Sequence, residues 1–318
     1  MKVCKIPAYF LISVGLGASP QAGAGSRDCA GGLTTNVVRF ETEIQYDDIQ
    51  SKANPTVYVL VNGKRSKMML DTGTNKNLLW DDALLDEEPG ALAESVDSHV
   101  ASADARIVNA TLTDDHGNSE RTEFYLVSNS VLAAAGYSGV LSPQAVAAHH
   151  AVVLDFDRDC IFTSAPFDIG SVKEAQIRRG TTIQNPYDVM AIRVEINGRD
   201  MPLLVDSGAT HTTILSSLIS FSPKGPESPR MKDLFGAELP EAGRMRLVDL
   251  KVNGRPFTAH PVIPAPSVSN KGIENVGYLG MDVLKEQVIY YDGARREFNV
   301  LTRRAVVSAL SERESRAK

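Results

Sequence analysis

The sequence predicts an all-β protein made of two duplicated, β-barrel-like lobes with short helices. Three observations support this fold class. The chain has 318 residues, a length that suits two domains of ordinary size. Several short segments recur in the same order at a nearly constant spacing, which indicates duplication of one unit. The repeated segments are apolar or alternate between apolar and polar residues, as strands do.

The repeat consists of four pairs of matching segments. They are residues 61–64 and 196–199, 69–73 and 204–208, 139–142 and 277–280, and 156–157 and 291–292. Three of the pairs are 135 residues apart, as residues 71 and 206 are. The segments at 139–142 and 277–280 are 138 residues apart. Four matches in one order favour a duplicated unit over chance.

Strand and turn signals predict the elements within each copy. Residues 57–61 and 192–196 are strand-like, and Asn-Gly follows each of them, a dipeptide typical of tight hairpins. Two further hairpins are predicted, with strands at 106–112 and 123–127 and at 245–252 and 257–263. Short helices are expected at 143–149 and 281–286.

These signals divide the chain into five parts. Residues 167–184 are polar enough for a linker or for a strand that bridges the lobes, and both interpretations stay open. The expected parts are a signal peptide at 1–24, lobe one at 36–166, the linker at 167–184, lobe two at 185–302 and a charged C-terminal tail at 303–318.

The N-terminus has the pattern of an export signal. Lys2 and Lys5 precede a mostly apolar run at 6–16, and the small residues 22–24 form a cleavage site. We therefore expect a periplasmic or secreted protein. No later stretch approaches the roughly 20 apolar residues that a membrane span needs.

Charge and cysteine content narrow the partners and the redox chemistry. The formal net charge is −6 and there is no basic stripe, so nucleic acid is not an expected partner. If the signal peptide is removed, Cys29 and Cys160 remain. They could form one disulfide in an oxidising compartment or stay as two separate thiols.

The chemistry lies in two short acidic motifs, each at the end of an apolar strand. They are Asp71-Thr72-Gly73, followed by Thr74, and Asp206-Ser207-Gly208. Two facing carboxylates cannot both ionise at close range, so they share one proton and can activate a water molecule between them. The small hydroxyl residues can lock the two loops together, and the glycines permit close backbone approach. No metal or cofactor is needed for this chemistry.

With these motifs the chain resembles the retropepsin-like branch of the aspartic peptidases, in a two-lobe, single-chain form similar to bacterial aspartyl proteases. A later element, Tyr278-Leu279-Gly280, also resembles that family. The resemblance implies a bilobal acid-protease fold with Asp71 and Asp206 as the catalytic dyad. It also implies an extended peptide or unfolded protein as substrate. A monomer is expected, because both aspartates lie in one chain.

The chain departs from the family pattern at three points. Ser142 stands where glycine is expected, and Ala209 lacks the hydroxyl that Thr74 could offer to Asp71, so Asp206 is expected to be the less supported aspartate. No flap is obvious, and residues 98–105 and 235–238 are the candidates.

The function predicted from the sequence is that of an exported aspartic endopeptidase. The alternative is a non-catalytic peptide-binding protein with a degenerate cleft, which the departures at Ser142 and Ala209 favour and the two intact motifs oppose. An enzyme acting on a non-peptide amide or ester also stays open. Metal binding by His149-His150 is not expected, because the spacing lacks a metal-site pattern.

Overall fold

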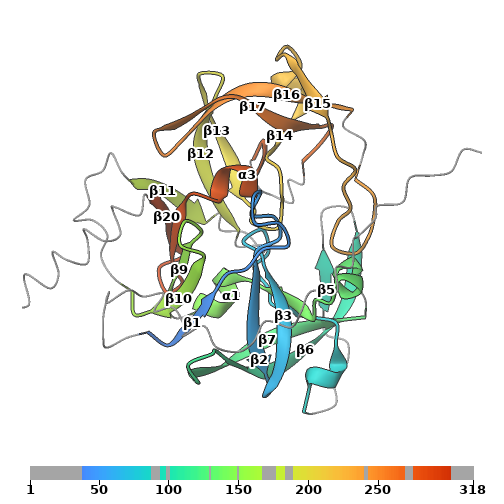
Figure 1. The fold of residues 1–318 in the computed structure, drawn as a ribbon, viewed down its shortest axis with the longest axis vertical. Helices are drawn as coiled ribbons and strands as arrows, with labels where there is room; N and C mark the ends of the chain where they lie inside the picture. The colour runs from blue at the N-terminus through green and yellow to red at the C-terminus, as the bar shows by residue number, and fades with distance from the viewer. Residues whose placement is uncertain are drawn as a thin grey trace, which may run out of the picture.

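The computed structural model shows two lobes joined by a shared sheet (Figure 1). It describes residues 38–86, 94–97, 101–128, 130–148, 150–166, 177–182, 189–239, 243–268 and 275–301. The predicted signal peptide, Cys29, His149 and the predicted C-terminal tail lie outside these residues. None of the helices formed by the described residues is long and apolar enough to cross a membrane.

Lobe one is a closed barrel of six strands. Its strands follow the order β2-β3-β8-β4-β7-β6, and β6 pairs back with β2 to close the barrel. A short strand, β5, extends the free edge of β6. The strands are β2 (Thr56–Val61), β3 (Lys64–Leu70), β4 (Leu78–Leu79), β5 (Glu94–Asp97), β6 (Ser102–Thr113), β7 (Ser119–Val127) and β8 (Gly139–Leu141).

Lobe two repeats the same barrel. Its order is β12-β13-β18-β14-β17-β16, and β16 pairs back with β12. Each strand thus has a counterpart in lobe one, with β15 in the place of β5. The strands are β12 (Met190–Ile196), β13 (Arg199–Val205), β14 (Thr213–Leu215), β15 (Lys224–Glu227), β16 (Arg244–Val252), β17 (Arg255–Ala265) and β18 (Gly277–Leu279). The prediction of an all-β, bilobal fold is confirmed.

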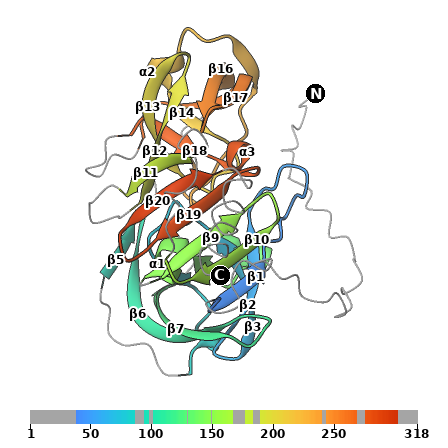
Figure 2. The same cartoon turned by 90° about the vertical axis from the view of Figure 1, so that its left-hand side faces the viewer.

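A six-stranded antiparallel sheet connects the lobes, and Figure 2 shows it facing the viewer. Its order is β1-β10-β9-β19-β20-β11, with three strands from each half of the chain. Leu154 of β9 lies opposite Ile289 of β19, and these residues are equivalent in the repeat, so the pseudo-two-fold axis passes between them. The strands are β1 (Phe40–Glu43), β9 (Ala151–Asp155), β10 (Cys160–Ser164), β11 (Ile177–Thr182), β19 (Val288–Asp292) and β20 (Glu297–Leu301).

β11 decides between the two interpretations of the segment at 167–184. It pairs with β20 on one side and with β12 of lobe two on the other. The described part of this segment is therefore a strand of the shared sheet.

The predicted Asn-Gly hairpins form as expected. In Asn62-Gly63 and Asn197-Gly198 both residues have positive φ angles, between 47° and 79°. This is the conformation of the tight turn that the dipeptide favours.

The helices are short. α1 ends before the predicted boundary because the chain must turn at Ala148, which has a φ of −3°, to enter β9. α3 ends early because Gln287 N bonds the Leu284 carbonyl and starts the turn into β19. The helices are η1 (Asp82–Leu84), η2 (Val131–Ala135), α1 (Pro143–Ala147), α2 (Ser216–Ile219) and α3 (Met281–Leu284).

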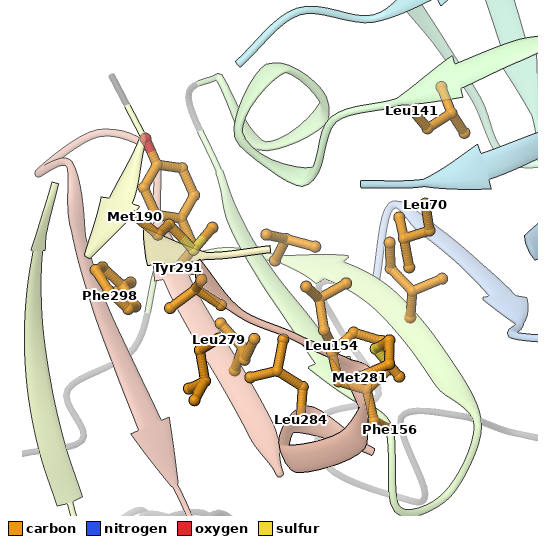
Figure 3. Packing of buried hydrophobic residues seen from close by; sticks show 14 of the residues in the cluster. Leu70, Leu141, Leu154, Phe156, Met190, Leu279, Met281, Leu284, Tyr291 and Phe298 are labelled. Atoms are coloured by element: carbon orange, nitrogen blue, oxygen red, sulfur yellow. The ribbon is translucent and has the colours of Figure 1, made fainter. Parts of the chain in front are cut away.

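One hydrophobic core runs from lobe one through the shared sheet into lobe two. Figure 3 shows Leu70 and Leu141 of lobe one in the same cluster as Leu279 and Met281 of lobe two. Burying each such side chain stabilises the fold by roughly 1.5–3 kcal/mol. The ends of β3 and β13, where the acidic motifs begin, therefore rest on a common packed base.

Candidate active site

The two aspartates lie at equivalent ends of the two barrels. Asp71 follows β3, and its N–H donates to the Leu141 carbonyl of β8 at 3.0 Å. Asp206 follows β13, and its N–H donates to the Leu279 carbonyl of β18 at 3.1 Å. In each lobe a parallel strand pair thus fixes the backbone from which the carboxylate projects.

A reciprocal pair of hydroxyl groups locks the two loops together. Thr72 Oγ1 donates to the Val205 carbonyl at 2.9 Å and accepts from Ser207 N at 2.9 Å. In the same way, Ser207 Oγ donates to the Leu70 carbonyl at 2.9 Å and accepts from Thr72 N at 3.0 Å. Both side chains are fully buried. Four buried hydrogen bonds across the pseudo-two-fold axis hold the loops in one relative position.

The glycines of the motifs show that the two carboxylates face each other. A Cβ on Gly73 would lie 2.7 Å from Asp206 Oδ1, and a Cβ on Gly208 would lie 2.8 Å from Asp71 Cγ. Each carboxylate is therefore packed against the glycine of the opposite loop, where no side chain fits. Gly73 N also donates to Asp71 Oδ1 at 2.7 Å, and Ala209 N donates to Asp206 Oδ1 at 3.1 Å.

The electrostatics make the two aspartates unequal. Burial raises the pKa of Asp71, while hydrogen bonds from Gly73, Asp206 and Gly208 oppose the rise. Burial and then the negative charge of Asp71 raise the pKa of Asp206 well above its usual range. The pair is therefore suited to share one proton, and the larger rise at Asp206 favours that carboxyl as the one that carries it.

Thr74 does not make the bond that was expected of it, and Ser142 is accommodated in the place of glycine. The Thr74 hydroxyl donates to the Lys76 carbonyl at 3.4 Å and not to Asp71. Ser142 fits in the place of glycine because its hydroxyl donates to the Thr74 carbonyl at 2.7 Å and accepts from Ala145 N at 3.3 Å, which caps α1. The Ser142 hydroxyl thus joins the end of β8 to the loop after Asp71.

Glycine is required at the equivalent position in lobe two. A Cβ on Gly280 would lie 2.6 Å from the carbonyl carbon of His211. The backbone of the loop after Asp206 thus lies closer to Gly280 than the loop after Asp71 lies to Ser142. His211 itself contributes backbone contacts here, since its carbonyl accepts from Thr213 Oγ1 at 3.5 Å.

The sequence analysis missed a set of polar residues behind the two loops. Gln144, which is buried, donates from Nε2 to the Thr72 carbonyl at 2.8 Å. In lobe two, Asp282 accepts from Thr212 N and Oγ1 and contacts His260. A signal was present, because polar Gln144 and Asp282 occupy matching positions, two residues after Ser142 and Gly280, in the two copies.

The two segments considered as flaps lie on the same side of the molecule. Residues 94–97 of β5 pair with residues 102–105 of β6, and residues 98–100 lie outside the described part. The loop that follows β15 descends from lobe two beside β5, opposite the shared sheet (Figure 1).

The loop after β15 makes contacts with lobe one. The Leu234 carbonyl accepts from Ser130 Oγ at 3.0 Å and from Val131 N at 3.3 Å. Leu234 and Phe235 pack against an apolar cluster of lobe one that includes Met69, which is two residues before Asp71. Lobe two therefore supplies apolar side chains to the surroundings of the Asp71 loop.

The structure also places Cys160, whose state the sequence left open, and Trp80. Cys160, in β10, is disulfide-bonded. Trp80 packs at the edge of the lobe-one cluster and donates from Nε1 to the Tyr137 carbonyl at 2.5 Å, as expected for a core residue.

The comparisons with known proteins agree with this geometry. Residues 192–283 match the family model described as aspartyl protease. These residues contain Asp206 and most of the lobe-two barrel. The resemblance to aspartic peptidases that the motifs predicted is confirmed.

Other comparisons give a distant structural likeness. A crystal structure of aspartic proteinase from Irpex lacteus is 12% identical, with 82% of this chain and 96% of that chain covered and a TM-score of 0.49. None of the curated proteins matches the chain in sequence.

Proposed function

We propose that this chain is an exported aspartic endopeptidase, with Asp71 and Asp206 as its catalytic dyad. The observation that carries the proposal is the pair of carboxylates packed against opposite glycines, where burial raises the pKa of both carboxyls and that of Asp206 the more strongly. The family match supports a peptidase of this class.

The unequal pKa values assign a role to each aspartate. Ionised Asp71 accepts a proton from a water molecule as the water oxygen attacks the scissile carbonyl carbon. Protonated Asp206 donates its proton to the carbonyl oxygen, which forms a tetrahedral diol. As the C–N bond breaks, Asp71 gives its proton to the leaving nitrogen and Asp206 recovers the proton from the diol. The products are a carboxylic acid and an amine, and no metal or covalent intermediate is involved.

The supporting residues serve the geometry of this reaction. Thr72 and Ser207 keep the loops in register, and Gly73 and Gly208 leave room for the carboxylates. We place Thr74 in the support as well, through its carbonyl, which accepts from Ser142.

The proposed location is periplasmic or secreted. The export-type N-terminus supports it, and the disulfide at Cys160 is in keeping with an oxidising compartment. The proposed active form is a monomer, because one chain supplies both aspartates. The proposed substrates are extended or unfolded peptide segments, which can bind by strand-like backbone hydrogen bonds.

The test is cleavage of an unfolded protein by the purified chain between pH 3 and 8, with products located by mass spectrometry. Asp71→Asn and Asp206→Asn should each abolish cleavage while retaining the fold, and the exposed control Asp115→Asn should cleave normally. Internal cuts would support an endopeptidase. Peptide binding without cleavage at any pH would favour the non-catalytic alternative, and cleavage that survives both substitutions would refute the dyad.

A further inference from the structure

A network of hydrogen bonds around the Asp282 carboxylate supports the Asp206 loop from behind. Asp282 Oδ1 accepts from Thr212 Oγ1 at 2.8 Å and from Thr212 N at 2.9 Å. Thr212 Oγ1 in turn accepts from Gly280 N at 3.1 Å. His260 Nε2, from β17, lies 2.9 Å from Asp282 Oδ2. A carboxylate only accepts hydrogen bonds, so Nε2 carries the hydrogen and donates it.

These hydrogen bonds anchor the far end of the loop that carries Asp206. The loop begins at Asp206, whose N–H is fixed on Leu279, and ends at Thr212, which is fully buried. The Thr212 carbonyl also accepts from Ile263 N at 2.9 Å. Movement of Thr212 would therefore move the loop that carries Asp206.

Lobe one holds the matching position with neutral groups. Asn77 occupies the place of Thr212, because its carbonyl accepts from Tyr125 N just as that of Thr212 accepts from Ile263 N. Asn77 Oδ1 accepts from Ser142 N at 3.0 Å, which matches the bond from Gly280. Its Nδ2 donates to Thr122 Oγ1 at 3.2 Å, and Thr122 stands where His260 stands in lobe two.

The difference between the lobes matters because a buried carboxylate needs all of its donors. The side chains of His260 and Asp282 are only 14% and 15% exposed. Removal of one partner from such a pair leaves a poorly solvated charge, which then seeks another arrangement. The matching residues of lobe one, Asn77 and Thr122, are neutral, so the loss of one donor there leaves no poorly solvated charge. Only the Asp206 loop therefore depends on a histidine donor.

We propose that His260 is a positioning residue for catalysis: it holds Asp282 on Thr212 and thereby fixes the loop that presents Asp206. The inference rests on the proposed function for its kinetic consequence. The role is one of geometry, since His260 lies behind the loop and contacts the dyad only through Asp282 and Thr212.

The first test compares two substitutions of similar size. His260→Phe keeps an aromatic ring beside Phe257, which packs edge-on to His260 at 5.7 Å, but it loses the donor. We expect kcat to fall by about 10- to 100-fold with KM changed by less than about threefold, since small misplacements of reacting groups are costly to the chemical step. His260→Gln keeps an N–H donor and should recover most of kcat. Equal kcat for wild type and His260→Phe, or no recovery in His260→Gln, would overturn the proposal.

The second test places the neutral residues of lobe one, Thr122, Asn77 and Gln144, at the matching positions of lobe two. The triple variant His260→Thr, Thr212→Asn, Asp282→Gln should approach wild-type kcat, whereas Asp282→Gln alone should not. If the triple variant does not fold, the comparison of His260→Phe with His260→Gln still decides the matter.

A third measurement separates this proposal from the proposed function. Hydrogen exchange of the amides of Thr212 and Gly280 should accelerate in His260→Phe, while exchange at Ser142 of lobe one should not change. If the wild type cleaves nothing, the proposed function fails and exchange alone decides whether His260 holds the loop. Unchanged exchange at Thr212 and Gly280 would overturn the positioning role even in an active enzyme.

Discussion

Replacement of Thr72 by valine tests the hydroxyl lock with almost no change in shape. Valine keeps the branched side chain, so no cavity forms, but the hydroxyl is lost. Two buried groups then lose their partners, the Val205 carbonyl and the Ser207 N–H, each bonded to Thr72 at 2.9 Å in the wild type. A buried unsatisfied group costs about 1–3 kcal/mol. Thr72→Val should therefore lower the free energy of unfolding by about 2–6 kcal/mol.

The fold should survive this loss because half of the lock remains. Ser207 Oγ still donates to the Leu70 carbonyl and accepts from residue 72 N. Urea unfolding gives the free energy, and an unchanged m-value would show that the same surface is exposed on unfolding. The control is Thr113→Val, whose hydroxyl bonds Ser119 at the surface and whose loss should cost less than about 0.5 kcal/mol. Equal stabilities for the two variants would refute the view that the lock holds the lobes together.

Three further outcomes are expected. Asp206→Asn should raise the free energy of unfolding at pH 7. The folded state raises the pKa of the Asp206 carboxyl, so the wild type loses stability as the pH rises above about 3.9, the pKa in the unfolded state. Urea unfolding from pH 3 to 8 should show a gain in stability of the variant over the wild type that grows with pH, and a uniform loss would contradict this. Gly208→Ala should reduce cleavage by about 100-fold or more, since the new Cβ lies 2.8 Å from Asp71 Cγ; normal kinetics would mean that the carboxylates do not face the glycines. Ser142→Gly should cost about 1–3 kcal/mol in urea unfolding, because the Thr74 carbonyl loses its donor; an unchanged stability would show that this carbonyl finds another partner.

The parts of the fold that the sequence predicted are those with local or repeated signals. The Asn-Gly turns at Asn62 and Asn197 depend on the backbone preferences of two residues, and both form as expected. The repeat predicted two equivalent barrels, because matching sequences adopt matching pairings. The facing of Asp71 and Asp206 followed from the chemistry of the motif combined with that symmetry.

Features that depend on distant pairing were harder to predict. The strand in the segment at 167–184 stayed open because its longer pairing is with β20, which lies more than a hundred residues away and leaves no local pattern. The bond expected from Thr74 to Asp71 does not form, since the Thr74 hydroxyl is bonded to its own loop at Lys76. The contact of Leu234 with Ser130 joins two lobes that the repeat describes separately, so no internal comparison could reveal it.

The two aspartates show how a duplicated scaffold can give equivalent carboxyls different pKa values. A strictly symmetric dyad would share its proton evenly, so small differences between the loops decide which carboxyl keeps it. Asp71 accepts from Gly73 N at 2.7 Å, whereas Asp206 accepts from Ala209 N at the longer distance of 3.1 Å. The shorter bond favours the ionised form of Asp71, and its charge then raises the pKa of Asp206. The sequence predicted a less supported Asp206 from the missing hydroxyl at Ala209; in the structure, burial and the charge of Asp71 raise the pKa of Asp206, and the backbone amides oppose the rise.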